Sequence, residues 1–139
     1  MNPEKFRAII LDIIRKDRRY SEEAYYFVNE GVGYASEMLQ KPQFGAARHL
    51  SIKELLEAIS DFALNEFGAM AVSVLQTWGL NTTLDIGHVV FNLIDANILS
   101  ASSDDKLGDF DEVFDLRARL KRPFLAENPL SNELKSIDS

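Results

Sequence analysis

The sequence contains no cysteine, and this absence excludes several classes of protein at once. Without thiols there is no disulfide framework, no thiolate zinc site and no cysteine nucleophile. Histidine is also scarce, since the 139 residues include only His49 and His88, with no HxxxH or HxxE spacing that would place two ligands on one helix face. A chain without cysteine is suited to a reducing compartment, and we expect a cytoplasmic protein.

Motifs for phosphate binding and serine hydrolysis are missing as well. The chain has no GxGxxG, no GxxxxGK[ST] and no GxSxG segment. Residues 104–115 hold six carboxylates, but their spacing does not match an EF-hand loop, and a solvated turn is favoured over a calcium or magnesium site. We therefore predict no catalytic residue, no cofactor and no bound metal.

Lysine and arginine are almost absent from the middle of the chain. Between Tyr20 and Leu116 there are 4 basic and 16 acidic residues, and the whole chain has a net charge of −7. Such a balance repels phosphate groups, so neither a nucleic acid nor an anionic membrane is expected as a partner.

Eight of the other eleven basic residues gather in two clusters, one on each side of this acidic region. They are Arg15, Lys16, Arg18 and Arg19 in the first cluster, and Arg117, Arg119, Lys121 and Arg122 in the second. If they met in space, they would form one interaction surface for an anionic partner. Alternatively, the first cluster neutralises the C-terminal end of a helix, and the second pairs with carboxylates such as Asp111 and Asp115.

Apolar spacing predicts a first amphipathic helix over residues 3–16. Its apolar residues recur with helical periodicity, at Phe6, Ile9, Ile10, Ile13 and Ile14. Because Asp12 interrupts this stretch and no small-residue cleavage site follows, we expect neither a signal peptide nor a membrane span.

Capping signals predict the later helices. Ser21 opens a helix that extends to residue 40, and residues 41–50 are expected to form a loop. Ser51 with Glu54 and Thr82 with Asp85 are capping boxes that open two further helices. Between them, Gly68 and Gly79 bound a short helix ending at Trp78, which we expect to be buried beside Phe62, Phe67 or Phe91.

The pattern changes after residue 97. The segment FDEVFDL, residues 110–116, alternates imperfectly and favours a β-hairpin. The predicted fold is therefore mainly α: one domain, residues 1–124, with about five helices, a short C-terminal β-hairpin and a C-terminal half like a winged helix. Residues 125–139 are expected to form a polar tail.

Four segments carry a resemblance to a known family. They are DRRYSEEAYYFVNEG, SIKELLEAISDFALNEFGAMAVSVLQTWGLNTTLDIGHVVFNLIDANIL, DFDEVFDL and KRPF. Together they resemble a small uncharacterised bacterial family of the Verrucomicrobia and Planctomycetes type, over about residues 6–124. The family brings no assigned activity, cofactor or site residue, and the resemblance implies a bacterial cytoplasmic protein.

We therefore expect a non-catalytic protein-interaction or structural module with a protein partner, and a homodimer is one form it could take. A winged-helix DNA-binding regulator is the first alternative, although its recognition helix, residues 82–96, carries Asp85 and Asp95 and no lysine or arginine. A metal-dependent hydrolase is the second, and it would need His49 or His88 to meet loop carboxylates from other elements.

Overall fold

Helices account for the regular structure of the described residues, which are 1–39, 50–100 and 105–125 of the computed structural model, and no strand occurs among them. The longest helices are α1 (Pro3–Lys16), α2 (Glu22–Met38), α3 (Ile52–Phe67) and α5 (Thr83–Asp95). The shorter ones are η1 (Gly68–Met70), α4 (Ala71–Thr77), η2 (Leu107–Phe110), α6 (Leu116–Lys121) and η3 (Arg122–Phe124). The mainly α fold predicted from the sequence is confirmed.

Both predicted capping boxes are formed. The Ser51 hydroxyl accepts from the Glu54 amide at 3.0 Å, while the Glu54 carboxylate accepts from the Ser51 amide at 2.9 Å. Thr82 and Asp85 make the same reciprocal pair at the start of α5. Gly68 follows α3 with a φ of +55°, a backbone conformation that glycine adopts without steric cost. These local signals place the starts of α3 and α5 where they were predicted.

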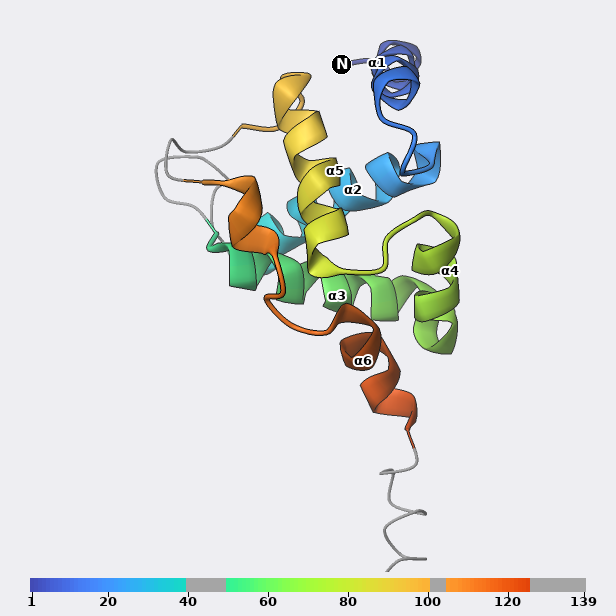
Figure 1. Ribbon diagram of the computed structural model, residues 1–139, viewed down its shortest axis with the longest axis vertical. Coiled ribbons are helices and arrows are strands. Elements are labelled where there is room, and N and C mark those ends of the chain that lie inside the picture. The colour runs from blue at the N-terminus through green and yellow to red at the C-terminus, as the bar shows by residue number, and fades with distance from the viewer. Residues whose placement is uncertain (40–49, 101–104, 126–139) are drawn as a thin grey trace, which may run out of the picture.

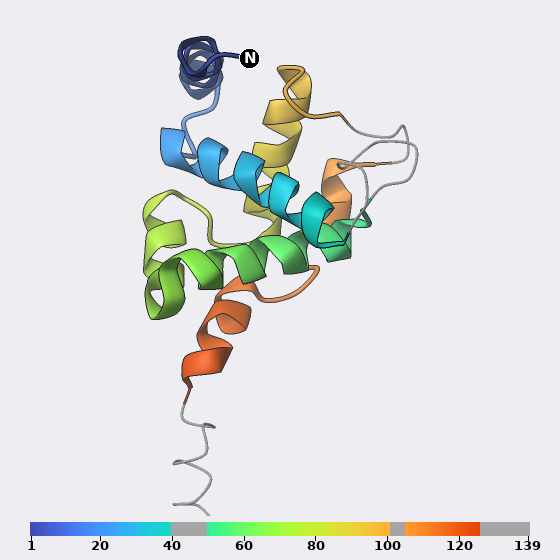
Figure 2. The ribbon, with the colours of Figure 1, turned by 180° about the vertical axis from the view of Figure 1, so that it is seen from behind.

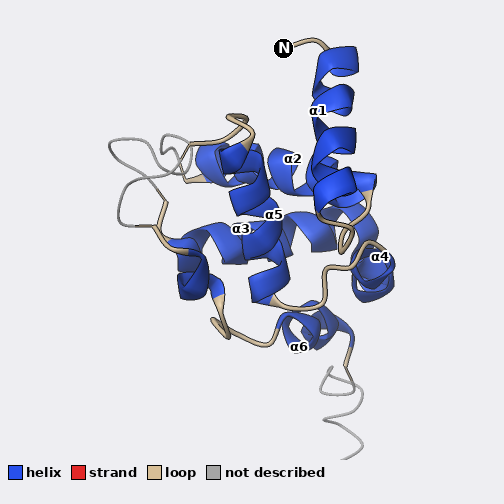
Figure 3. Cartoon of the chain, turned by 45° about the horizontal axis from the view of Figure 1, so that its top comes forward, coloured by secondary structure: helices blue, strands red, loops and turns tan. Residues whose placement is uncertain are grey.

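The central layer consists of α2 and α3, which pack side by side and run in opposite directions (Figure 2). α5 crosses one face of this layer, where it contacts α2 and η2 (Figure 1). α1 packs against α2 at one end of the long axis, and α6 packs against α3 and α4 at the other (Figures 1 and 3). The side of α2 and α3 that faces away from α5 has no described helix over it (Figure 2).

The segment after α5 is a correction to the predicted fold, because residues 105–125 contain no β-hairpin. Phe110 is fully buried, and a Cβ on Gly87 of α5 would lie 2.5 Å from its ring. The buried Thr83 hydroxyl donates to the Phe110 carbonyl at 2.7 Å and accepts from the Val113 amide at 3.3 Å. The backbone of this segment therefore bonds to α5 and not to a second strand.

The residues that follow form a helix. The Asp115 side chain accepts from the Ala118 amide at 3.0 Å and caps α6, whose Leu116 and Leu120 are buried four residues apart. The alternation of FDEVFDL thus reflects one buried phenylalanine followed by a helix cap. Since the described residues contain no wing, the winged-helix description of the C-terminal half is not supported either.

Two predicted segments fall mostly outside the described residues. The predicted loop 41–50, which includes His49, is described only at Leu50, and the predicted tail 125–139 is described only at Leu125. Leu50 is 1% exposed and joins the core, whereas Leu125 is 42% exposed.

The stretch from α3 through α4, Ile52–Thr77, is long and apolar enough by composition to cross a membrane, since an 18-residue window within it has a mean hydropathy of 1.3. In the structure this stretch bends at Gly68, and α3 buries Leu55, Leu56 and Ile59 within the domain core. Core helices of globular domains meet the same composition test, so the stretch is weak evidence for a membrane span.

Candidate functional site: the groove between α1 and α5

The first basic cluster lies at the C-terminal end of α1 and is largely paired within that region. Arg15 and Lys16 contact the Asp12 carboxylate at 3.0 and 3.4 Å, and Arg19 contacts Asp17 at 2.7 Å. Arg18 is exposed and has no ion pair within the described ranges. Most of the positive charge is thus neutralised beside the helix end that it also stabilises.

The second basic cluster lies on α6 and η3, directly after residues 110–116, for which the sequence predicted a hairpin. Arg119 pairs with Glu57 of α3 at 2.6 Å, and its guanidinium lies 4.1 Å from the centre of the Phe114 ring. For Arg119 the predicted pairing with Asp111 or Asp115 is wrong, because the helix turns this side chain toward α3. α1 and α6 occupy opposite ends of the long axis, so the two clusters do not meet (Figure 1).

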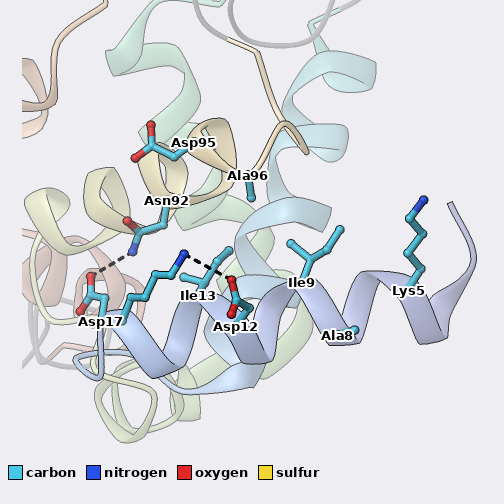
Figure 4. Close-up of a pocket in the computed structure, with 10 residues that line it drawn as sticks. Lys5, Ala8, Ile9, Asp12, Ile13, Asp17, Asn92, Asp95 and Ala96 are labelled. Atoms are coloured by element: carbon cyan, nitrogen blue, oxygen red, sulfur yellow. Dashed lines mark hydrogen bonds and ion pairs between the residues drawn. The ribbon is translucent and has the colours of Figure 1, made fainter.

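An open groove of about 750 Å³ runs between α1 and the C-terminal end of α5. Its apolar surface is made of small and branched aliphatic side chains, namely Ala8, Ile9, Ile13 and Ala96. Charged side chains surround this surface, namely Lys5, Asp12, Lys16, Asp17 and Asp95. Figure 4 shows Ile9 and Ile13 pointing from α1 toward the end of α5.

α1 is attached to the rest of the domain near both of its ends and, in its middle, through the buried Ile10. Near the start, Phe6 packs edge-on against Tyr26 at 5.5 Å, and Arg7 pairs with Glu22 at 2.8 Å. Beyond the other end, Asn92 of α5 donates to Asp17 at 3.0 Å. Within α1 itself, Ile10 alone is fully buried. The apolar stripe predicted from the sequence is therefore only partly covered by the rest of the described chain.

A polar network joins the α1–α2 connection to α5 at the edge of the groove. The Arg19 guanidinium donates to both carboxylate oxygens of Asp17, at 2.9 and 2.7 Å. Asn92 donates to Asp17 and also to the Tyr25 hydroxyl, both at 3.0 Å. Hydrogen bonds from Arg19, and then from Asn92, hold the pKa of Asp17 far below its ordinary value. The Asp17 carboxylate therefore joins the end of α1 to α5 directly, and Asn92 extends the network to Tyr25 of α2.

His88 of α5 lies beside this network, with its Nδ1 3.3 Å from the Arg19 guanidinium. Burial and the positive charge of Arg19 lower the pKa of His88, so the ring is neutral and Nδ1 accepts from Arg19. The ring also stacks on Tyr20 at 6.3 Å, and the Tyr20 hydroxyl donates to Asp85 at 2.8 Å. These contacts position the chain between α1 and α2.

The described ranges contain no candidate metal site, since no group of three or more histidine, aspartate or glutamate side chains there could hold an ion. Asp104 of the acidic segment lies outside the described residues, as does His49. The convergence that a metal-dependent hydrolase would require is thus not seen in this part of the chain.

Sequence reasoning did not single out the groove. The sequence predicted Ile9 and Ile13 as part of a core-facing stripe. It predicted no role for Ala8, Asn92 or Ala96. The available signal was the width of the stripe, since five large apolar residues on one short helix can exceed the surface that one neighbouring helix covers. No protein-family model, curated protein or solved structure matches this chain.

Proposed function

We propose that this protein is a non-catalytic protein-interaction module that binds an amphipathic helix of a partner protein in the groove between α1 and α5. The observation that carries the proposal is the apolar surface of Ile9 and Ile13, which lines an open groove, while Ile13 also packs in part against the core. Apolar surface between two helices is the usual seat of a third helix. A bacterial origin and a cytoplasmic location, which the sequence suggests, belong to the same proposal.

The groove also indicates the chemistry of its partner. Ile9 and Ile13 are one helical turn apart, which suits a partner helix with apolar residues at i, i+3 and i+4. Lys5 at one end of α1 and Asp95 on α5 have no ion pair within the described ranges. A partner helix that carries both signs of charge beside its apolar stripe would pair with them.

Site-specific photocrosslinking tests the proposal. A benzophenone amino acid at position 8 places the reactive group in the groove, and the same group at position 11 provides the control. Leu11 lies on the same helix and is 39% exposed but does not line the groove. In cells of the native host we expect a distinct crosslinked protein from position 8, absent from position 11 and lost when Ile13→Glu is added.

The identity of the crosslinked species also distinguishes the partners. A product with twice the mass of the chain would identify a second copy, and sedimentation velocity of the purified protein would then show a dimer. Identical products from positions 8 and 11, or products that survive Ile13→Glu in a folded protein, would contradict the proposal.

The two alternative functions gain no support from the described structure. α5, the helix proposed to read DNA, packs between α2 and η2 and buries Ile86, Val89, Val90 and Leu93. Neither α4 nor α5 carries a lysine or arginine, which groove-reading helices bring to phosphates and bases. The metal-dependent hydrolase lacks a ligand set among the described residues.

A further inference from the structure

A continuous row of aromatic rings follows the junction of α2 and α3 toward α4. Phe62 lies 5.2 Å from Tyr34 and 5.4 Å from Phe27, measured between ring centres. Phe27 in turn lies 6.0 Å from Phe67 and 5.7 Å from Trp78. Phe27 is buried, and the other four rings are half-buried, so each exposes part of its surface. We call these five residues the aromatic row.

Carboxylates accompany the aromatic row along both helices. On α2, Glu23, Glu30 and Glu37 alternate with Phe27 and Tyr34 at helical spacings of three and four residues, so all five lie on one face. All three glutamates are exposed. On α3, Asp61 and Glu66 flank Phe62. The surface therefore combines apolar rings with a dense negative charge.

Within the described residues, no lysine or arginine forms an ion pair with the glutamates of this surface. α2 contains no lysine or arginine, and the segment from Glu54 to Ser100 contains none either. Other carboxylates are paired, such as Glu22 with Arg7 and Glu57 with Arg119. In the described ranges Glu23, Glu30, Glu37 and Glu66 have no ion pair. The like charges repel one another, and a cationic partner would relieve that repulsion.

The Tyr34 hydroxyl is already occupied on this surface. It donates to Asp61 at 2.6 Å and accepts from the Asn65 amide at 3.1 Å. Both bonds hold the ring across the junction of the two helices. What Tyr34 offers a partner is therefore its ring face, beside a carboxylate.

We propose that the aromatic row and its flanking carboxylates form a second binding surface, which takes an arginine-rich segment of a partner protein. A guanidinium stacks on aromatic faces and pairs with carboxylates through two parallel hydrogen bonds. The row and the glutamates provide both contacts within one helical turn. The ammonium of lysine is a compact, strongly hydrated charge that uses this combination less well. The surface lies on α2, α3 and α4 and does not include the groove, so it extends the proposed function to a second contact.

Unlabelled octa-arginine is the first probe, because Trp78 is the sole tryptophan and reports on the surface directly. We expect saturable quenching or a shift of its fluorescence at an ionic strength near 0.15 M. Octa-lysine has the same charge and should bind more weakly, by about two- to fivefold for each guanidinium that stacks on a ring. Equal affinity for the two peptides would overturn the role of the aromatic row.

Charge reversal tests the position of the surface. The variant Glu23→Lys/Glu30→Lys/Glu37→Lys should bind octa-arginine at least about tenfold more weakly. The control Glu4→Lys/Asp111→Lys/Glu112→Lys makes the same change in net charge on α1 and after η2, and it should bind nearly as the wild type does. Circular dichroism confirms that both variants are folded.

Two results would contradict the proposal. Equal loss in both charge variants would show attraction to the net charge alone. Concentration-dependent self-association of the wild type, abolished in the Glu23, Glu30, Glu37 variant and kept in the control, would assign the surface to a second copy of this chain. These measurements are independent of the groove, so this proposal can fail while the proposed function stands.

Discussion

Gly87 of α5 is tightly packed, whereas Gly33 of α2 has open space beside it, so substitution of each glycine tests the packing at one residue. A Cβ on Gly87 would lie 2.5 Å from Cγ and 2.6 Å from Cβ of Phe110, whereas a Cβ on Gly33 would meet nothing within 4 Å. Phe110 is fully buried and held by the bond between its carbonyl and Thr83, so it cannot move aside freely. Gly87 is therefore required by packing, and Gly33 is not.

We predict that Gly87→Ala lowers the free energy of unfolding by about 1–3 kcal/mol, the usual cost of overpacking. Gly33→Ala, the matched control, should raise it by about 0.5–1 kcal/mol, because alanine loses less backbone entropy in a helix. Urea unfolding followed by circular dichroism measures both values. A neutral Gly87→Ala would mean that Phe110 does not pack against α5.

Asp17 gives a pH-dependent prediction. Its folded pKa is depressed, chiefly by the hydrogen bond from Arg19, so its contribution to stability is complete above the ordinary carboxyl pKa and falls as the carboxylate is protonated. Asp17→Asn should lower the free energy of unfolding by about 1–2 kcal/mol at pH 7, as expected for bonds to a charged group. The difference from wild type should shrink as the pH falls below about 4.

Unfolding titrations of both proteins between pH 7 and acid test this sign. The control is Asp12→Asn, since Asp12 is half exposed and its pairs with Arg15 and Lys16 should contribute at most about 1 kcal/mol. A difference for Asp17→Asn that grows toward acid would contradict the assigned network.

At the scale of the element, α6 is the helix that sequence reasoning missed. Its cap, Asp115, is followed by buried leucines at positions 116 and 120, which is a short helical pattern. The alternation of Phe110 and Phe114 with charged residues favoured a β-hairpin over this helical pattern. A six-residue helix has little intrinsic stability, so its formation depends on packing against α3 and α4.

The cap of α6 can be tested directly. Asp115→Ala should lower the free energy of unfolding by about 1 kcal/mol, because the Ala118 amide loses its acceptor. Asp111→Ala removes an exposed carboxylate that caps no helix and should change stability by less than about 0.5 kcal/mol. Equal values for the two variants in urea unfolding would be inconsistent with a capped helix.

For Trp78 the sequence predicted the position at the end of a short helix correctly, but the predicted burial of the side chain is wrong. It follows α4 and contacts Phe67, as predicted, but its other aromatic neighbour is Phe27. Phe91, the third residue predicted as a neighbour, packs against Phe110. Trp78 is half-buried and not part of the fully buried core.

At the scale of the whole molecule, stability should be unevenly distributed. α2, α3 and α5 each bury several residues completely, whereas α1 buries only Ile10. Native-state hydrogen exchange should therefore show α1 amides opening at a lower free energy than those of the central helices. Equal protection in α1 and α3 would contradict this order. An occupied groove should raise the protection of α1, which links the measurement to the proposed function.

The charge distribution is also a property of the whole molecule. The sequence shows two basic clusters around an acidic middle, but their separation follows from the placement of α1 and α6 at opposite ends (Figure 1). Within the described ranges, Glu23, Glu30 and Glu37 of α2 have no ion pair. One chain thus presents a mixed-charge groove on α1 and α5 and an acidic aromatic surface on α2 and α3.

By itself, the sequence determined where the main helices begin and end, because capping boxes, a left-handed glycine and apolar periodicity act within one or two turns. Ser51 with Glu54 and Thr82 with Asp85 mark the starts of α3 and α5, and Gly68 marks the end of α3. Only the tertiary structure decided which apolar faces are covered and what the last segment becomes. The position of Phe110 on Gly87 and the open side of Ile9 and Ile13 both depend on contacts between segments far apart in the chain. Local propensity does not encode such contacts, and the candidate sites of this protein are made of them.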